Sequence, residues 1–109
     1  MAKLTRTLRG DFGEVLNRVV KTVLNGSVSA TLEDSWEGSR CGSRCAVRVF
    51  ERYSYMGGNR VSMSVTLFQD QTGGPIELCA ITSGGSQATF FKINTIGEEA
   101  FLDTLRSAF

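Results

Sequence analysis

Three features of this sequence predict an α+β fold, in which an antiparallel sheet of five to six strands carries two helices on one face. Two stretches, 12–24 and 100–109, place apolar residues at helical spacing behind capping-box signatures. The segments between them alternate apolar and polar residues, as strands with one buried face do. Short glycine-containing turns join the later segments, so neighbouring strands must run antiparallel. Two helices with one apolar stripe each must share a sheet face to bury it, which predicts a two-layer sandwich.

The chain length predicts one domain. At 109 residues the chain is long enough to bury a core of its own, so residues 1–109 are expected to form a single domain. The expected order of elements is β-α-β-β-β-β-β-α. This order resembles the TATA-binding-protein-like and helix-grip arrangements, and the resemblance concerns the fold alone.

The first two predicted elements are a strand and a helix. Residues 3–9 alternate apolar with basic or hydroxyl side chains, which indicates a strand. Asp11 and Glu14 then have the spacing of a capping box, and Asn25-Gly26 is a typical helix end. The apolar stripe of this helix consists of Phe12, Val15, Leu16, Val19, Val20, Val23 and Leu24.

A second strand and a long connection are predicted next. Residues 27–32 alternate small polar and apolar side chains, which predicts a short strand. Residues 33–44 are rich in glycine and serine, so we expect a mobile connection there. Trp36, the single large apolar residue of this connection, is expected to cover an edge of the core rather than to stack on a ligand.

The third and fourth strands are predicted to form a hairpin around a turn at 57–59. Alternation in the third strand puts one set of side chains on one face, namely Cys45, Val47, Val49, Tyr53 and Tyr55. The opposite set is Ala46, Arg48, Phe50 and Arg52. In the fourth strand, residues 61–67 have the clearest period-two pattern of the chain, with apolar residues on one face and serine or threonine on the other.

The last elements are a pair of strands and a helix. Residues 76–81 and 88–94 are predicted as strands on either side of a polar glycine turn. Thr95 and Glu98 form a second capping box, which starts the terminal helix. Its apolar stripe consists of Ala100, Phe101, Leu105, Ala108 and Phe109.

Composition disfavours several classes of function. The chain contains no histidine, which removes Ser-His and Cys-His nucleophile pairs and most catalytic zinc sites, so we expect a non-enzymatic protein without a cofactor. The apolar runs are far shorter than the ~20 residues of a membrane-spanning helix. The N-terminus lacks the apolar core of a signal peptide, so we expect a cytoplasmic protein. The net charge of +1 favours neither nucleic acid nor an anionic membrane.

The three cysteines leave one alternative open. Cys41 and Cys45, with a distant Cys79, lack the fourth ligand of a structural zinc site, so no metal is expected. Arg40 and Arg44 flank Cys41, and nearby cations make a thiol more reactive. An enzyme or redox-responsive protein that uses Cys41 is therefore the alternative to a binding module.

The polar glycine turn is the strongest candidate ligand site. It comprises Thr82, Ser83, Gly84, Gly85, Ser86 and Gln87, and successive glycine N–H groups can form a concave nest for phosphate or carboxylate. It matches neither the G-x-x-x-x-G-K-[ST] nor the G-x-G-x-x-G phosphate-binding motif, and a hairpin turn explains the same residues. We expect a small anionic ligand or a protein partner to use this turn together with Tyr53, Tyr55 and Arg60 of the neighbouring hairpin.

The sheet face away from the helices is the second candidate. Arg48, Phe50, Arg52 and Arg60 are expected to project there beside Phe68. An open face of this kind is suited to pairing with a second subunit, so a homodimer with Arg48, Phe50, Arg52 and Phe68 in its interface is expected. Nucleic acid binding on the same face is an alternative, which the small net charge disfavours.

Three stretches also carry a family resemblance. They are Glu51 to Ser62 (ERYSYMGGNRVS), Ala80 to Gln87 (AITSGGSQ) and Phe90 to Leu102 (FFKINTIGEEAFL). The chain resembles, nearly end to end, a bacterial family of short proteins known only as a domain of unknown function. The resemblance implies a small stand-alone cytoplasmic protein, and it implies no catalytic residue or ligand.

Overall fold

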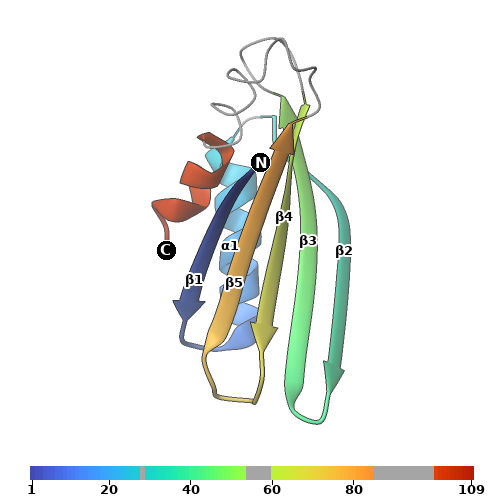
Figure 1. Cartoon of the computed structure of the whole chain (residues 1–109), viewed down its shortest axis with the longest axis vertical. Helices are drawn as coiled ribbons and strands as arrows, with labels where there is room; N and C mark the ends of the chain where they lie inside the picture. Colours follow the sequence, from blue (N-terminus) through green and yellow to red (C-terminus); the bar gives the residue numbers. More distant parts are fainter. Residues whose placement is uncertain (28, 54–59, 85–99) are drawn as a thin grey trace.

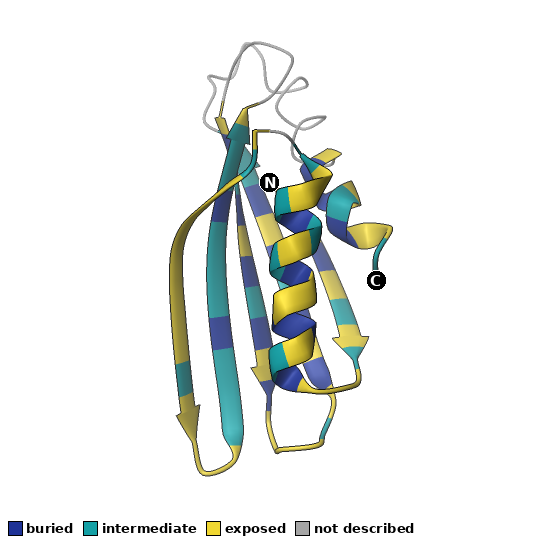
Figure 2. Cartoon of the chain, turned by 180° about the vertical axis from the view of Figure 1, so that it is seen from behind, coloured by how far each residue is buried: buried dark blue, intermediate teal, exposed yellow. Residues whose placement is uncertain are grey.

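The computed structural model describes residues 1–27, 29–53, 60–84 and 100–109, and it has two layers (Figure 1). Within these ranges the sheet consists of β1 (Ala2–Leu8), β2 (Thr31–Arg40), β3 (Ser43–Tyr53), β4 (Arg60–Gln69) and β5 (Ile76–Gly84). The second layer contains α1 (Phe12–Gly26) and a helical segment at 100–106. Both helices lie on the same face of the sheet (Figure 2), so the predicted α+β class and the layering are confirmed.

The strand order in the sheet is β1-β5-β4-β3-β2, and every neighbouring pair is antiparallel. β4 is therefore the central strand, with β1 at one edge and β2 at the other. Three of the pairings join strands that are consecutive in sequence, as short connections require. The connection from β1 to β2 is different, because it joins the two edge strands and contains α1, which packs on one face of the sheet (Figure 1).

The core lies between the helix layer and the inner face of the sheet. The sheet contributes the alternate residues Val61, Met63, Val65, Leu67, Ile76, Leu78 and Ala80, all at most 1% exposed. The helices contribute Phe12, Val15, Leu16, Val19, Val23, Phe101, Leu102 and Leu105, which are also buried. The predicted alternation of the fourth strand and the predicted stripe of the first helix are confirmed. In the segment 100–106, Phe101 and Leu105 are buried as predicted, whereas Ala100 is exposed and Leu102, which the predicted stripe left out, is buried. The predicted strand at 88–94 and the second capping box lie outside the described residues.

Local contacts fix the ends of the helix layer. The Asp11 carboxylate accepts the Glu14 backbone N–H at 3.0 Å, which caps the first turn of α1. Near the other end of α1, a Cβ atom added to Gly26 would lie 2.0 Å from the Thr104 Cγ2 atom, so the 100–106 segment packs closely there. Arg18 donates to the Ala108 carbonyl at 2.6 Å and places its guanidinium 4.5 Å from the centre of the Phe109 ring. The C-terminal residues are thus held against α1.

The prediction for residues 33–44 is wrong, and the predicted second strand begins later, at Thr31. The stretch expected to be a mobile connection is most of β2, which pairs with β3 along its length except for a bulge between Leu32 and Asp34. Cys41 and Gly42 form the tight turn to β3, with φ values of 52° and 88° that suit a two-residue hairpin turn. β2 is exposed along nearly its whole length, so hydrophobic alternation never marks it as a strand. Trp36 is 60% exposed and does not cover the core.

The predicted faces of β3 are also reversed. Phe50 lies opposite Met63 and Arg48 lies opposite Val65, which places both on the inner face of the sheet. Phe50 is completely buried. Arg52, two residues further along the same face, holds its guanidinium 4.6 Å from the centre of the Phe101 ring. The expected placement of Arg48, Phe50 and Arg52 away from the helices is therefore wrong, because β3 uses its arginine face to cover the core.

Candidate functional site

The outer face of the sheet, opposite the helices, carries a band of apolar side chains that are partly exposed. No described helix or strand covers this face (Figure 1). The band, called the open-face band below, consists of Trp36, Cys45, Val47, Val49, Phe68, Cys79 and Ile81. Phe68 is 43% exposed and Ile81 is 40% exposed, although both come from strands whose other face is buried. An apolar band on an open sheet face is typical of an interaction surface.

Strand register arranges the open face in rows. The first row runs from Lys3 on β1 through Ile81, Ser64 and Val49 to Asp34 on β2. The second row contains Thr5, Cys79, Thr66, Val47 and Trp36. The third row contains Thr7, Glu77, Phe68, Cys45 and Gly38. In the first two rows a hydroxyl on β4 is flanked by apolar or thiol side chains. The first row ends in Lys3 and Asp34, and the second ends in Thr5 and Trp36.

A polar cluster follows these rows at the end of the sheet where β3 ends and β4 begins (Figure 1). Arg60 forms an ion pair with Glu51 at 2.6 Å, and its guanidinium lies 5.4 Å from the centre of the Tyr53 ring. Next to them, the Ser62 and Ser83 hydroxyls are 2.9 Å apart. The structure thus brings together Tyr53, Arg60 and Ser83, three of the residues expected to bind a ligand. Arg60 and Phe68 both lie on the outer face, as expected.

The polar glycine turn begins later than predicted. Thr82 is inside β5 and completely buried, and its hydroxyl donates to the Ala2 carbonyl at 3.4 Å. A buried Thr82 with a structural hydrogen bond is not available to a ligand, so that part of the prediction is wrong. Gly84 is the last residue of β5. Gly85, Ser86, Gln87 and Tyr55 lie outside the described residues.

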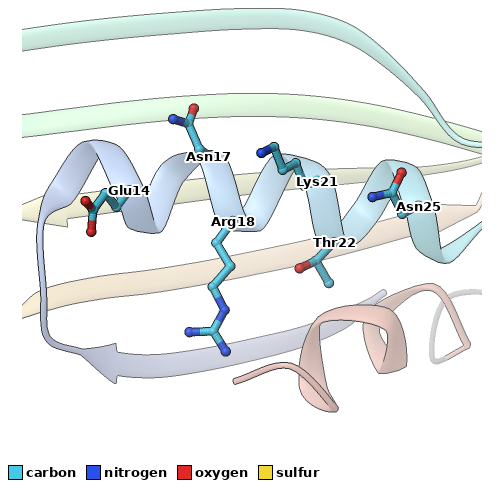
Figure 3. A pocket seen from close by; sticks show the side chains of 6 residues that line it. All are labelled: Glu14, Asn17, Arg18, Lys21, Thr22 and Asn25. Carbon is cyan, nitrogen blue, oxygen red and sulfur yellow. The ribbon is translucent and has the colours of Figure 1, made fainter.

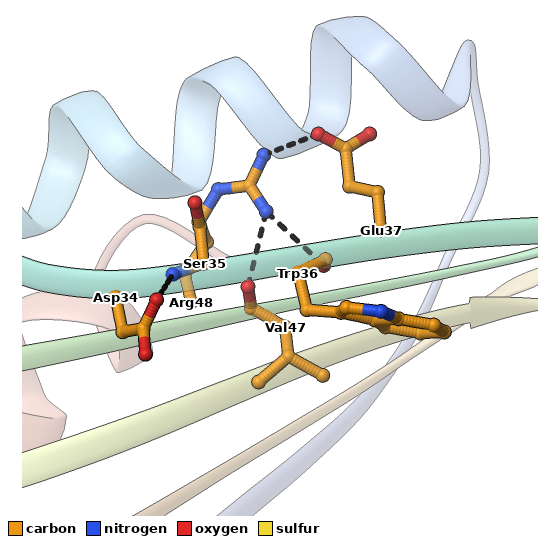
Figure 4. A network of polar contacts seen from close by, with 6 residues as sticks. All are labelled: Asp34, Ser35, Trp36, Glu37, Val47 and Arg48. Atoms are coloured by element: carbon orange, nitrogen blue, oxygen red, sulfur yellow. Dashed lines mark hydrogen bonds and ion pairs between the residues drawn. The ribbon is translucent and has the colours of Figure 1, made fainter.

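The inner face of β3 holds a second polar network, shown in Figure 4. Arg48 donates to the Glu37 carboxylate at 2.7 Å and to the Val47 carbonyl at 3.0 Å, and its side chain is only 12% exposed. The same guanidinium reaches the Trp36 carbonyl at 3.4 Å. Separately, on the outer face of β2, the Asp34 carboxylate accepts the backbone N–H of the next residue, Ser35, at 2.8 Å. The contacts of Arg48 are the ones that join the two strands. This network ties β2 to β3, so it serves the fold of the hairpin.

Two shallow hollows lie on the helix side of the molecule. One, of about 440 Å³, follows the solvent side of α1, where Glu14, Asn17, Arg18, Lys21, Thr22 and Asn25 point away from the sheet (Figure 3). The other, of about 540 Å³, lies between the end of α1 and the 100–106 segment. Both are lined by side chains of mixed charge and polarity. Neither shows the apolar lining with a few convergent polar groups that is typical of a small-molecule site.

The described residues contain no group of three or more histidine, cysteine, aspartate and glutamate side chains placed to hold a metal ion. All three cysteines are free thiols, with Cys41 exposed in the β2–β3 turn and Cys45 and Cys79 half-buried on the open face. None of the helices in the described part of the chain has the length and apolar character that crossing a membrane requires.

Sequence reasoning missed the contribution of β2 to the open face. Asp34 and Trp36 project there because the bulge shifts the register of β2 by one residue. The available signal was the turn pair Cys41-Gly42, which follows ten residues that could pair with the next strand. An exposed tryptophan in a polar segment was the other signal.

The fold and this surface define a class: a two-layer α+β domain in which the described helices lie on one face of an antiparallel sheet and leave the other uncovered. The chain belongs to a family of unknown function, DUF6054, whose family model matches residues 1–109. The predicted resemblance to a family of unknown function is therefore confirmed, while a bacterial origin stays a prediction. A search of the curated proteins found no match.

Proposed function

We propose that this chain is a non-enzymatic protein-interaction module that forms a homodimer through the open face of its sheet. The observation that carries the proposal is the open-face band, in which Trp36 is 60% and Phe68 is 43% exposed. Tryptophan and phenylalanine are enriched in protein interfaces, where they bury large apolar areas. A flat sheet face suits a flat protein partner, whereas a small ligand requires a concave pocket.

The charges on the open face support a protein partner over nucleic acid. Lys3 and Arg60 are balanced there by Asp34, Glu51 and Glu77. The arginines expected to contact phosphates, Arg48 and Arg52, are on the inner face. A nucleic-acid surface needs a basic patch, so the geometry disfavours this alternative.

The other candidate functions have less support. Arg60 is already paired with Glu51, which reduces its attraction for a small anion. Cys41 lies in a tight hairpin turn, which gives it a structural role that requires no redox chemistry. We also propose a cytoplasmic location, because three free thiols suit a reducing compartment.

A charge in the open-face band tests the proposed function. Val47→Lys puts an ammonium group in the middle of the band, where dimerisation would strip it of water. Sedimentation velocity over a range of concentrations should show a dimer for the wild type and a monomer for Val47→Lys. The control is Asn17→Lys on the exposed side of α1, which should remain dimeric. A wild type that is monomeric at all concentrations contradicts the proposal.

A further inference from the structure

We infer that the second copy packs on the open face around a twofold axis that runs parallel to β4, so that Lys3 of each copy meets Asp34 of the other. This inference rests on the proposed function and specifies how the two copies meet. It follows from the rows on the open face, because β4 is the central strand of the five. A rotation about an axis along β4 exchanges β1 with β2 and β5 with β3.

The first row is self-complementary under this rotation. Lys3 and Asp34 occupy its two ends, and both side chains are exposed. The rotation places Lys3 over Asp34 of the second copy at both ends of the row. Ile81 then meets Val49, and Ser64 meets Ser64. Opposite charges, apolar groups and hydroxyls are matched at every position of the row, as an isologous interface requires.

The next two rows are compatible with the same axis. In the second row Cys79 meets Val47, Thr66 meets Thr66, and the exposed Trp36 covers Thr5. In the third row the two Phe68 rings meet across the axis, which favours an aromatic contact.

The one charged residue of the third row is Glu77. It accepts a hydrogen bond from the Thr7 hydroxyl at 3.0 Å, so its carboxylate is held toward the β1 edge. The residue facing Thr7 in the second copy is Gly38, which leaves space beside this carboxylate. Glu77 itself faces Cys45 of the second copy, and its carboxylate is turned toward the β1 edge, where Gly38 carries no side chain.

Other face-to-face arrangements lose this match. A twofold axis that lies in the sheet plane perpendicular to the strands places β1 over β1 and β2 over β2. Lys3 and Asp34 are on opposite edges of the sheet, so they never meet in any such arrangement. An axis through the first row would even oppose Lys3 to Lys3 and Asp34 to Asp34, which is unfavourable. Of these arrangements, the axis along β4 is the one that brings Lys3 over Asp34 of the second copy.

The area is close to what a stable dimer needs. Five strands spaced about 4.8 Å apart and about seven residues long give a face of about 24 Å by about 23 Å. Two such faces bury about 1,100 Å², before the longer β3 and β4 are counted. Specific protein interfaces bury at least about 1,200 Å² in total, so a stable dimer must bury nearly the whole open face of each copy.

Zero-length cross-linking tests the contact directly. A carbodiimide joins an amine to a carboxylate that touches it, and the test mixes ¹⁴N- and ¹⁵N-labelled copies of the full chain. We expect mass spectrometry to find a peptide that links Lys3 to Asp34 and carries both labels. Within one copy these residues are four strands apart, about 19 Å, so an intramolecular link is excluded. A dimer that lacks this link overturns the arrangement.

Charge reversal is the second measurement. Lys3→Glu and Asp34→Lys should each weaken dimerisation about tenfold at low ionic strength, and the double variant should regain most of the loss. Lys21→Glu, the same charge change on the exposed side of α1, should have no effect. If the wild type dimerises and the double variant is as weak as the single variants, the arrangement is wrong while the proposed function stands. If the wild type is monomeric, both fail.

Discussion

The two faces of β3 differ from those of a simple two-layer sandwich, in which the inner face is apolar and the outer face is polar. The inner face, which meets the core, carries Arg44, Arg48 and Arg52 around Ala46 and Phe50. The outer face carries Cys45, Val47 and Val49, which are only half-buried. Charged residues are thus on the core side of this strand, and apolar residues are on the side that has no cover among the described residues.

The position of α1 explains the inner face. The helix runs along the strands over the middle of the sheet, so it does not reach over β2 (Figure 2). The rim of the core beside α1 must be covered by side chains of β3. Arginine suits this position because its stem lies over apolar surface while the guanidinium reaches solvent or an aromatic ring. Arg44 does so over Phe12, with its guanidinium 4.4 Å from the ring centre.

The described residues of one copy give no comparable explanation for the outer face. Apolar residues on this face of β3 continue into Phe68 and Ile81 on the neighbouring strands. A strand with one face on the core and one in solvent normally carries polar side chains on the solvent face. The contrast between the two faces of β3 is therefore the strongest indication that the outer face is covered in the functional state.

The largest effect is expected at the buried centre of the inner face. Phe50→Ala removes a completely buried ring, and the free energy of unfolding should fall by about 3–5 kcal/mol. The matched change on the outer face is Val49→Ala, which should cost less than about 1 kcal/mol in a monomer. Urea unfolding monitored by circular dichroism measures both, in a Val47→Lys background that removes any contribution from dimerisation. Equal losses for the two variants would contradict the assignment of the faces.

This reversal marks the limit of what the sequence could predict. The apolar stripe of α1 and the alternation of β4 could be predicted because one side of each element is buried and the other is exposed to solvent. The alternation in β3 could also be predicted. Both of its faces combine apolar with polar or charged residues, so the sequence of the strand alone does not show which face is the inner one. β2 was missed because it buries neither face, and it is held by its pairing with β3.

The candidate site was predictable to a similar extent. Arg60 and Phe68 were placed on the correct face because the pattern of β4 is unambiguous. Asp34 and Trp36 were missed together with their strand. Phe50 was assigned to the interface because it shares a face of β3 with Arg48 and Arg52, whereas its partner across the sheet, Met63, belongs to the core.

An intermediate effect is expected at the rim of the inner face. Arg44→Ala removes both the stem and the guanidinium from the Phe12 ring, and the loss of stability should be about 1–2 kcal/mol. Arg44→Met keeps an apolar stem, so it should lose only about 0.5–1 kcal/mol. Arg40→Ala is the control, because Arg40 is exposed at the end of β2. If Arg44→Ala is no worse than Arg40→Ala, the arginines of β3 do not cover the core.

The smallest effect is expected for the ion pair that joins β2 to the inner face of β3. Glu37→Gln keeps a hydrogen-bond acceptor for Arg48 but removes the charge, and the Glu37 side chain is 50% exposed. Because solvent screens such a pair, the loss of stability should be about 0.5 kcal/mol or less. Arg48→Met should cost more, since it also removes the bonds to the Trp36 and Val47 carbonyls. Hydrogen exchange at β2 amides should therefore be faster in Arg48→Met and nearly unchanged in Glu37→Gln. The reverse order would show that the charge, rather than the carbonyl contacts, holds β2 in place.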